Sequence, residues 1–104
     1  MPALQDLEAI ADYIALDNPL AARGLVERVF ERVARWEAHP ESGSHPLELR
    51  RSSRRYRQIV EPPCRVFYRY ERSSERVFVL SVIRGERRLR KRPLIQRDRE
   101  NPMV

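Results

Sequence analysis

Apolar residues in the first part of the chain recur every three or four positions, the spacing that places side chains on one side of an α-helix. The first such segment runs to about Leu16, with its apolar stripe at Leu4, Leu7, Ile10, Ala11 and Ile14. The second ends at His39, with its stripe at Ala22, Leu25, Val26, Val29, Val33 and Trp36. Between them, Asn18 can cap a helix and Pro19 suits a first helical turn. We predict an antiparallel helical hairpin.

After residue 46 the apolar period changes from about 3.6 to 2, which is typical of β-strands. Four runs with this pattern are separated by short polar turns: residues 47–50, 55–60, 64–70 and 77–83. We therefore expect an α+β fold, in which the helical hairpin packs on an antiparallel sheet of three or four strands.

Two of these runs differ in the character of their faces. In the run 64–70, one face carries Cys64, Val66, Tyr68 and Tyr70, and the other carries Arg65, Phe67 and Arg69. We expect the second of these faces to be half exposed. The run 77–83 is apolar on both faces, which predicts a strand in the middle of the sheet.

The end of the chain has a different pattern. Residues 86–92, ERRLRKR, are expected to form one or two helical turns before Pro93, and residues 93–104 a poorly ordered tail. A chain of 104 residues is long enough for one domain with one core, which we place at residues 1–92.

Composition excludes several classes of protein. No run of about 18 apolar residues occurs, and the N-terminus lacks the basic and then apolar order of a secretory signal, so we expect a cytoplasmic protein without a membrane segment. The only cysteine, Cys64, falls in a predicted strand and is expected to be a core residue. His39 and His45 lack metal-ligand spacing, so we expect no metal and no cofactor.

Charge is distributed unevenly along the chain, whose formal net charge is +6. Residues 1–46 hold four Arg against eight acidic residues, whereas residues 47–104 hold seventeen basic residues against seven acidic ones. This asymmetry fits contact with a polyanion or with an acidic protein surface. The alternative is a solvated surface with no partner, and composition leaves both open.

Few residues suggest catalysis. Glu8 and Asp12 lie one turn apart on the first helix, where two carboxylates are commonly just solvated. Arg65 and the group Arg84, Arg87 and Arg88 are predicted to converge at one end of the sheet, because antiparallel neighbours place the start of one strand beside the end of the next. Such guanidinium groups can bind phosphate or carboxylate and can stabilise a charged transition state.

The order of these segments resembles a known family. The helix DLEAIADYIALDNP, the second helix with EAHPESG after it, and the runs LELR, CRVFYRY and VFVLSVIRGERR are together similar to the RelE/ParE superfamily of bacterial toxins. The first helix looks most like the ParE branch. That resemblance implies a toxin of a type II toxin-antitoxin module, which inhibits DNA gyrase until a ParD-like antitoxin binds it in a hetero-oligomer.

The RelE branch, whose members cleave messenger RNA on the ribosome, is the alternative. Its pattern would assign catalytic roles to Arg65, Arg87 and Lys91, and the last of these stands where that branch has an aromatic residue. Lys91 is a poor general acid or base unless its pKa is lowered, and no His lies nearby. The sequence therefore favours a toxin that binds its target over an endoribonuclease.

The chain also departs from the family. Members usually have a β-strand before the Pro that precedes the first helix, whereas here the sequence starts with Met1 and Pro2. Either that strand is lost or the chain begins downstream of it. We therefore expect a sheet with an exposed edge that a partner could occupy.

These arguments give two sets of candidate binding residues. The target-binding candidates are Arg84, Arg87, Arg88, Arg90, Lys91 and Arg92. The antitoxin-binding candidates are Tyr13, Leu16, Phe30 and Arg65. A third interpretation is a general basic nucleic-acid-binding domain, or a toxin relative without activity; direct nucleic-acid binding is compatible with the toxin interpretation but is not required by it.

Overall fold

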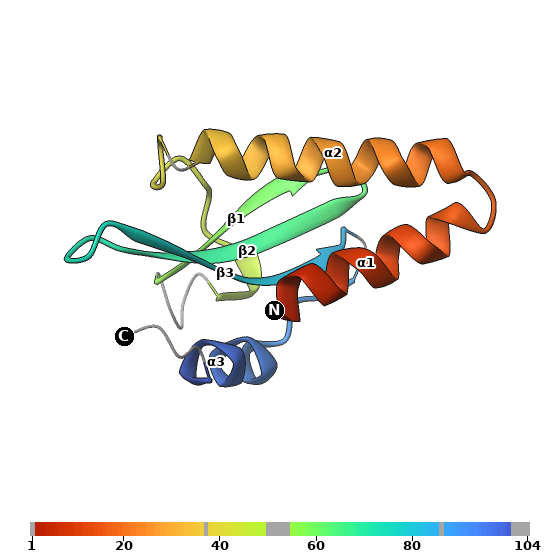
Figure 1. The fold of residues 1–104 in the computed structure, drawn as a ribbon. Helices are drawn as coiled ribbons and strands as arrows, with labels where there is room; N and C mark the ends of the chain where they lie inside the picture. The colour runs from red at the N-terminus through yellow and green to blue at the C-terminus, as the bar shows by residue number, and fades with distance from the viewer. Residues whose placement is uncertain (1, 37, 50–54, 86, 101–104) are drawn as a thin grey trace.

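The computed structural model describes residues 2–36, 38–49, 55–85 and 87–100 of the chain. Its elements are α1 (Pro2–Ala15), α2 (Pro19–Trp36), the 3-10 helix η1 (Leu47–Leu49), β1 (Tyr56–Glu61), β2 (Cys64–Glu71), β3 (Arg76–Arg84) and α3 (Lys91–Arg99). The strands form one antiparallel sheet in the order β1-β2-β3. Figure 1 shows the hairpin of α1 and α2 on one face of this sheet and α3 on the other. The predicted α+β class is confirmed.

The helical hairpin forms where the sequence predicts it. Asn18 caps α2 by accepting a hydrogen bond from the Ala21 amide at 3.0 Å. The stripe of α1 is shifted by one position at its start, because Ala3 is buried while Leu4 is 39% exposed. The hairpin and the sheet enclose the first core cluster: Ala3, Leu7, Leu25, Val29, Trp36, Ile59, Cys64, Val66, Tyr68 and Val82. Cys64 is a fully buried core residue, as predicted.

The opposite face of the sheet is also buried, which corrects the expectation that it would be half exposed. Phe67 is fully buried there and Arg69 is 8% exposed. These two residues are covered because α3 and η1 pack on this face. The second core cluster consists of Leu49, Tyr56, Phe67, Phe78, Leu80, Leu89 and Leu94.

The sheet has three strands, because residues 47–49 form η1 and not the predicted strand. The Leu49 amide donates to the carbonyl of Pro46 at 3.0 Å, and the Leu49 side chain enters the second core cluster. Alternation of apolar and polar residues over four positions does not distinguish a short strand from one helical turn with a buried side chain. Arg50, the last residue of the predicted strand, lies outside the described residues.

The middle strand is β2, so the prediction that residues 77–83 form a middle strand is wrong. β3 lies at the edge of the sheet and is apolar on both faces because helices cover both: α1 on one side and α3 on the other. A register shift between Phe67 and Tyr68 also changes which face of the sheet the side chains of β3 occupy. Leu80 packs in the second cluster and Val82 in the first, whereas a regular strand would place both on one face.

The C-terminal helix lies further along the chain than predicted. Arg90 has extended backbone angles (φ −103°, ψ 128°), and α3 then runs from Lys91 to Arg99. Pro93 falls in the first turn of this helix, where a backbone amide has no intrahelical acceptor, so it does not stop the helix. Leu94 is 2% exposed, so the expectation of a poorly ordered tail is wrong for residues 93–99.

Candidate functional site: a groove along the outer edge of β3

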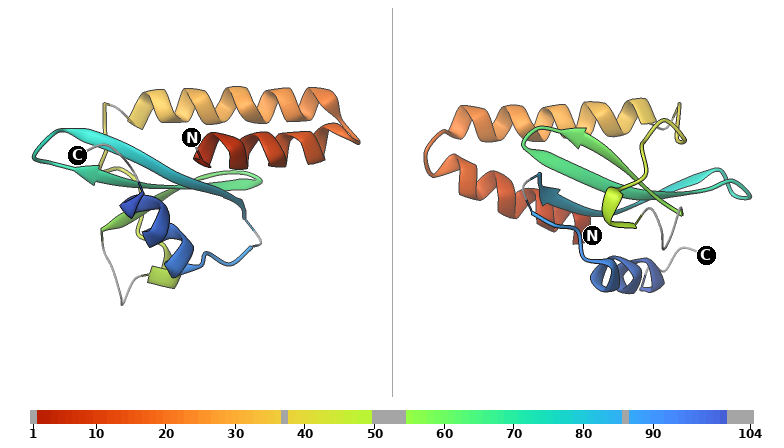
Figure 2. Two further views of the ribbon diagram at one scale, coloured as in Figure 1. Left: turned by 60° about the horizontal axis from the view of Figure 1, so that its bottom comes forward. Right: turned by 180° about the vertical axis from the view of Figure 1, so that it is seen from behind.

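A groove of about 780 Å³ follows the edge of β3 that is not paired with β2. Its walls come from α1, from the end of β3, from residues 87–90 and from the start of α3. Figure 2 shows how residues 87–90 leave the end of β3 and pass to α3 on the other side of the sheet. The groove is lined by Asp6, Ala9, Ile10, Tyr13, Ser81, Val82, Ile83, Arg84, Arg87, Arg88, Leu89, Arg90, Pro93, Leu94 and Arg97.

Cations lie along the rim of this groove. Arg84 lies over the ring of Tyr13, with 5.2 Å from its guanidinium carbon to the ring centre. The five cations that follow it along the chain are named here the rim cations and are all exposed: Arg87, Arg88, Arg90, Lys91 and Arg92. The first three line the groove, and the last two begin α3. Within the part of the chain that the structure describes, none of the five forms an ion pair. The rim cations therefore present positive charge that no described acidic residue neutralises by an ion pair.

An ion pair closes the floor of the groove. The Val82 amide donates to Asp6 Oδ2 at 3.0 Å, and Arg97 Nη1 donates to the carbonyl of Leu80 at 3.1 Å. Arg97 Nη2 also donates to Asp6 Oδ1 at 3.0 Å, and this hydrogen bond raises the pKa of Arg97. Two side chains from α1 and α3 therefore bond to backbone groups of an edge strand, which limits pairing with another strand.

Arg65 lies on the other side of the sheet. Paired residues of neighbouring strands share a face, and Arg84 is opposite Cys64 whereas Arg65 is opposite Ile83. Arg65 and Arg84 therefore reach the same end of the sheet, as predicted, but on different faces. Arg65 donates two hydrogen bonds to Glu48, at 2.7 and 3.1 Å, and a third to the carbonyl of Arg87 at 2.9 Å.

Glu48 completes this ion pair. Hydrogen bonds from Arg65 lower the pKa of Glu48 to about 2, against the opposing effect of its burial, and the Leu89 amide adds a further hydrogen bond at 3.0 Å. The side chains of Arg65 and Glu48 are only 13% and 16% exposed. This pair holds residues 87–89 against the sheet and so positions the rim of the groove.

The other predicted antitoxin-binding residues are on the helical hairpin. Tyr13 is 61% exposed and lines the groove. Leu16, at the turn between α1 and α2, is 82% exposed, and Phe30 of α2 is 54% exposed. The structure thus brings Tyr13 together with the rim cations, while Leu16 and Phe30 belong to the outer surface of the hairpin.

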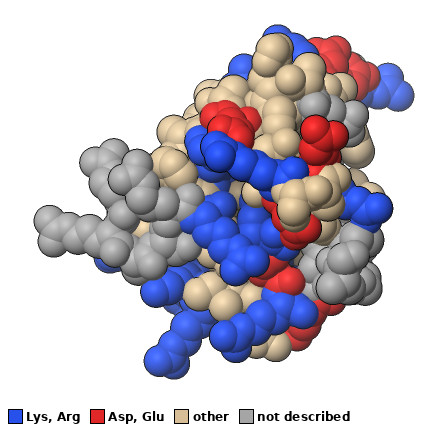
Figure 3. All heavy atoms as spheres, turned by 90° about the vertical axis from the view of Figure 1, so that its left-hand side faces the viewer, with Lys and Arg blue, Asp and Glu red and all other residues tan. Residues whose placement is uncertain are grey.

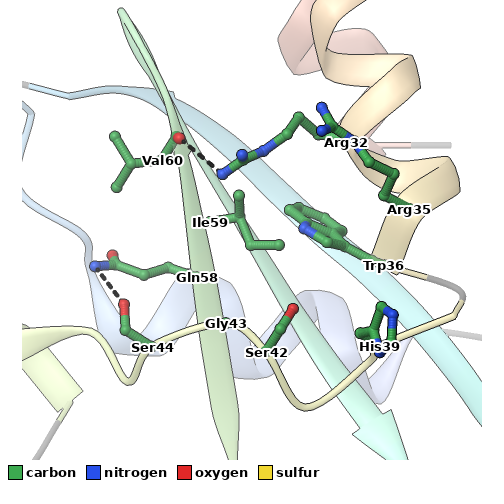
Figure 4. A pocket seen from close by; sticks show the side chains of 10 residues that line it. All are labelled: Arg32, Arg35, Trp36, His39, Ser42, Gly43, Ser44, Gln58, Ile59 and Val60. Carbon is green, nitrogen blue, oxygen red and sulfur yellow. Dashed lines mark hydrogen bonds between the residues drawn. The ribbon is translucent and has the colours of Figure 1, made fainter.

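The second cavity, of about 490 Å³, lies at the opposite edge of the sheet (Figure 4). It is bounded by the end of α2, residues 39–44 and β1, and its lining includes His39. At this edge Ser44 and Gln58 exchange backbone hydrogen bonds of 2.7 and 3.1 Å, and Arg32 donates to the carbonyl of Val60 at 3.4 Å. The edge of β1 is therefore closed in part by backbone pairing.

A different basic surface surrounds the turn between β2 and β3. Figure 3 shows this end of the molecule, where blue and red side chains lie next to one another. Arg72 makes two hydrogen bonds to Glu41, at 2.7 and 2.9 Å, and these lower the pKa of that carboxyl. Arg57 donates to the carbonyls of Glu41 and Gly43. Arginines at this end are thus engaged by neighbouring groups, unlike the rim cations.

Sequence reasoning missed the two residues on the floor of the groove. Asp6 and Arg97 are 91 residues apart, and Arg97 falls in the segment predicted to be a poorly ordered tail. The described residues contain no group of three or more His, Cys, Asp or Glu that could hold a metal ion. No described helix is long and apolar enough to cross a membrane.

Comparison with families of known proteins gives a match over most of the chain. Residues 1–89 match the family model described as the ParE toxin of the type II toxin-antitoxin system parDE. The match covers the helical hairpin, the sheet and the part of the groove formed by β3 and residues 87–89. A search of curated proteins finds no match.

Proposed function

We propose that the protein acts in the cytoplasm by binding DNA gyrase. The basis is its family, because the chain belongs to the ParE toxin family of type II toxin-antitoxin systems. A ParD-like antitoxin neutralises it in a hetero-oligomer. On this proposal the protein is a binding toxin and not an enzyme, and the rim cations Arg87, Arg88, Arg90, Lys91 and Arg92, together with Arg84, contact the target.

The observation that carries this proposal is the state of the rim cations. Exposed arginines that keep their charge and form no ion pair with the described residues can bind carboxylate or phosphate groups of another macromolecule at little cost. Among the described residues that line the groove there is no His and no Cys, and the one carboxylate among them, Asp6, is held by Arg97. This arrangement suits recognition better than proton transfer.

The endoribonuclease alternative requires Arg65 to contact a phosphate. Arg65 is instead bonded to Glu48 and to the carbonyl of Arg87, and its side chain is 13% exposed. Releasing it would leave the Glu48 carboxylate without its main partner. The same contacts argue for a supporting role of Arg65 and against its earlier assignment to antitoxin binding. Tyr13, Leu16 and Phe30 remain our proposed antitoxin contacts on the hairpin.

The test is the triple variant Arg87→Gln, Arg88→Gln, Arg90→Gln. Its expression should no longer stop growth, and the purified variant should no longer inhibit supercoiling by DNA gyrase, because the charges that bind the target are gone. Messenger RNA from cells expressing the unsubstituted chain should stay intact in primer extension.

The matched control replaces three exposed arginines elsewhere: Arg23→Gln, Arg35→Gln, Arg99→Gln. It removes the same charge and should keep full growth inhibition. Equal loss of activity in both variants would mean that only net charge matters. Cleavage of transcripts at codon boundaries would replace this proposal by the endoribonuclease.

A further inference from the structure

We propose that the cavity of about 490 Å³ at the edge of β1 binds a small phosphate monoester, such as a mononucleotide or a sugar phosphate. Figure 4 shows the residues that line this cavity. The site lies at the opposite edge of the sheet from the rim cations, and it is independent of the proposed function. It is carried by two arginines, by the neutral donors around them and by the hydrogen bonds that occupy the nearby carbonyls.

Two arginines of α2 supply the positive charge of the cavity. Arg32 and Arg35 line it and are three residues apart, so they lie side by side on the helix. The side chain of Arg35 is exposed and forms no ion pair with a described residue. Guanidinium groups bind phosphate through paired hydrogen bonds. Two such groups match the charge of a phosphate monoester, which is about −1.5 to −2 at neutral pH.

Arg32 is held by long contacts. Its Nη2 donates to the carbonyl of Val60 at 3.4 Å, and its Nε lies 3.5 Å from Glu61 Oε2. That Nε is buried and has no hydrogen-bond partner among the described residues, which is uncommon in folded proteins. The Arg32 guanidinium can therefore turn towards a phosphate at little cost. Glu61 keeps its hydrogen bond from Arg28, at 3.1 Å, when it does so.

Neutral donors complete the lining. The side chains of His39, Ser42, Ser44 and Gln58 line the cavity together with the two arginines. Imidazole, hydroxyl and amide groups can each donate a hydrogen bond to a phosphate oxygen. The Ser44 hydroxyl and the Gln58 amide nitrogen are 3.5 Å apart, so their mutual contact is weak. Among the described residues that line the cavity there is no carboxylate, so an anion meets no charge repulsion from them.

The end of α2 is also suited to an anion. The last carbonyls of a helix normally lack partners and carry partial negative charge. Here the Arg35 carbonyl accepts a hydrogen bond from the Ala38 amide at 3.2 Å. The Trp36 carbonyl accepts one from the His39 amide at 2.9 Å. These bonds reduce the negative potential that the helix end presents to the cavity.

The loop between α2 and η1 is fixed in place by the sheet. Arg57 Nη1 donates to the carbonyls of Glu41 and Gly43, at 3.0 and 2.9 Å. The Gly43 amide donates to the Tyr68 hydroxyl at 2.9 Å, and a side chain at position 43 would collide with that hydroxyl. The Glu41 carboxylate is bonded to Arg72. The loop therefore holds its donors in position before a ligand arrives, which lowers the entropic cost of binding.

The volume of the cavity leaves room for more than a phosphate group. Pockets of roughly 300–1,000 Å³ typically hold small organic ligands. Trp36 and Ile59 contribute apolar atoms to the wall, against which the organic part of an ester can pack. A monoester should therefore bind more tightly than inorganic phosphate.

The experiment uses the full chain labelled with ¹⁵N. Trp36 is the one tryptophan of the chain and lines the cavity, so the signal of its indole N–H reports binding there. The chain is titrated with adenosine monophosphate, inorganic phosphate and adenosine at about 0.15 M salt, which screens attraction to exposed charges. The monophosphate should shift the indole signal. Inorganic phosphate should need a higher concentration, and adenosine should bind at least about tenfold more weakly than the monophosphate.

Variants of α2 test the role of the arginines. Arg35→Gln should weaken binding of the monophosphate about tenfold, because it removes one charge and one pair of hydrogen bonds to the phosphate. No ion pair with a described residue is lost in this variant, so its fold should be unchanged. The matched control is Arg23→Gln, on the same helix and outside the cavity, which should leave binding unchanged.

Several results would overturn the inference. One is an indole signal that does not move with about 10 mM monophosphate, and another is equal weakening by Arg35→Gln and Arg23→Gln. Equal binding of adenosine would show that the phosphate is not recognised. Equal binding of succinate would assign the cavity to carboxylates. A single-stranded oligonucleotide that binds more tightly than the monophosphate, and loses this with Arg35→Gln, would assign it to nucleic acid.

These readouts involve neither growth inhibition nor gyrase. Arg35→Gln leaves the rim cations intact, so loss of phosphate binding in this variant should not change toxicity. If the chain proves non-toxic, the cavity can still be tested with the monophosphate.

Discussion

Arg69 lies between the sheet and α3, whereas Arg88 lies on the rim of the groove. The side chain of Arg69 is 10% exposed, is bonded to Asp98 at 3.0 Å, and lies over the ring of Phe78 at 4.5 Å. Arg88 is exposed and forms no ion pair with any residue that the structure describes. Both belong to the half of the chain with the strong positive charge.

The contrast shows that a basic composition does not by itself indicate how many cations are available to bind another molecule. Arg65, Arg69 and Arg97 each hold a carboxylate that joins a helix to the sheet, so their charges are neutralised within the fold. The rim cations, in contrast, are exposed and form no ion pair with a residue that the structure describes. Removing a buried partner should therefore destabilise the fold, while removing a rim charge should change only what the protein binds.

The largest effect is expected for Asp98→Ala. Asp98 accepts hydrogen bonds from Arg69 and from the Tyr56 hydroxyl at 3.0 Å, and its side chain is 6% exposed. The variant leaves the buried guanidinium of Arg69 with Glu71, at 3.2 Å, as its remaining carboxylate partner among the described residues. We therefore expect a loss of about 3 kcal/mol, the lower end of the range for a broken buried ion pair. Urea unfolding monitored by circular dichroism measures the loss.

Arg99→Ala serves as the control for that measurement, because Arg99 is exposed on the same helix. Its free energy of unfolding should stay within about 0.5 kcal/mol of the unsubstituted chain. A similar small change for Asp98→Ala would show that the pair with Arg69 contributes little.

A smaller effect should appear when the pH is lowered. The pKa of Glu48 is about 2 in the folded chain, below the ordinary value of 4.5 for a glutamate, so the folded state favours the ionised carboxylate. Its contribution to stability is present above about pH 4.5 and is lost as the pH falls towards 2. We expect a contribution of about 1–2 kcal/mol, allowing for partial screening by solvent.

The comparison for this prediction is Glu48→Gln, which cannot ionise. The difference in unfolding free energy between the two proteins should be largest near pH 6 and should shrink as the pH approaches 2. A difference that does not depend on pH would mean that the Arg65 contact does not favour the ionised form of Glu48.

The smallest effect on stability is expected for the rim variant with Gln at positions 87, 88 and 90. These side chains are exposed, and no ion pair with a described residue is lost. Its free energy of unfolding should remain within about 0.5 kcal/mol of the unsubstituted chain in urea. A large loss of stability would assign these arginines to the fold and would remove the contrast with Arg69.

Local pattern predicted much of the architecture. The helices of the hairpin, the Asn18 cap, three of the four predicted strands and the burial of Cys64 follow from periodicity and residue type. The errors have a common origin. Each depends on which part of the molecule covers a segment, and local sequence pattern does not indicate this. The three cases are the position of β3 at the sheet edge, the single turn of η1 and the helix after Arg90.

The site was predicted only in part for the same reason. The sequence indicated that cations gather after β3 and that the sheet has an edge for a partner. It did not indicate that Arg65 is held by Glu48, or that Asp6 and Arg97 meet on the floor of a groove.

The sequence by itself determined the two helices of the hairpin and the three strands, because helix and strand periods, caps and turn residues act over a few positions. It also determined the overall excess of positive charge. Only the tertiary structure decided which charges are neutralised and which remain on the surface, because an ion pair needs its two groups within about 4 Å. Asp6 and Arg97 reach that distance only when α1 and α3 pack beside the same strand.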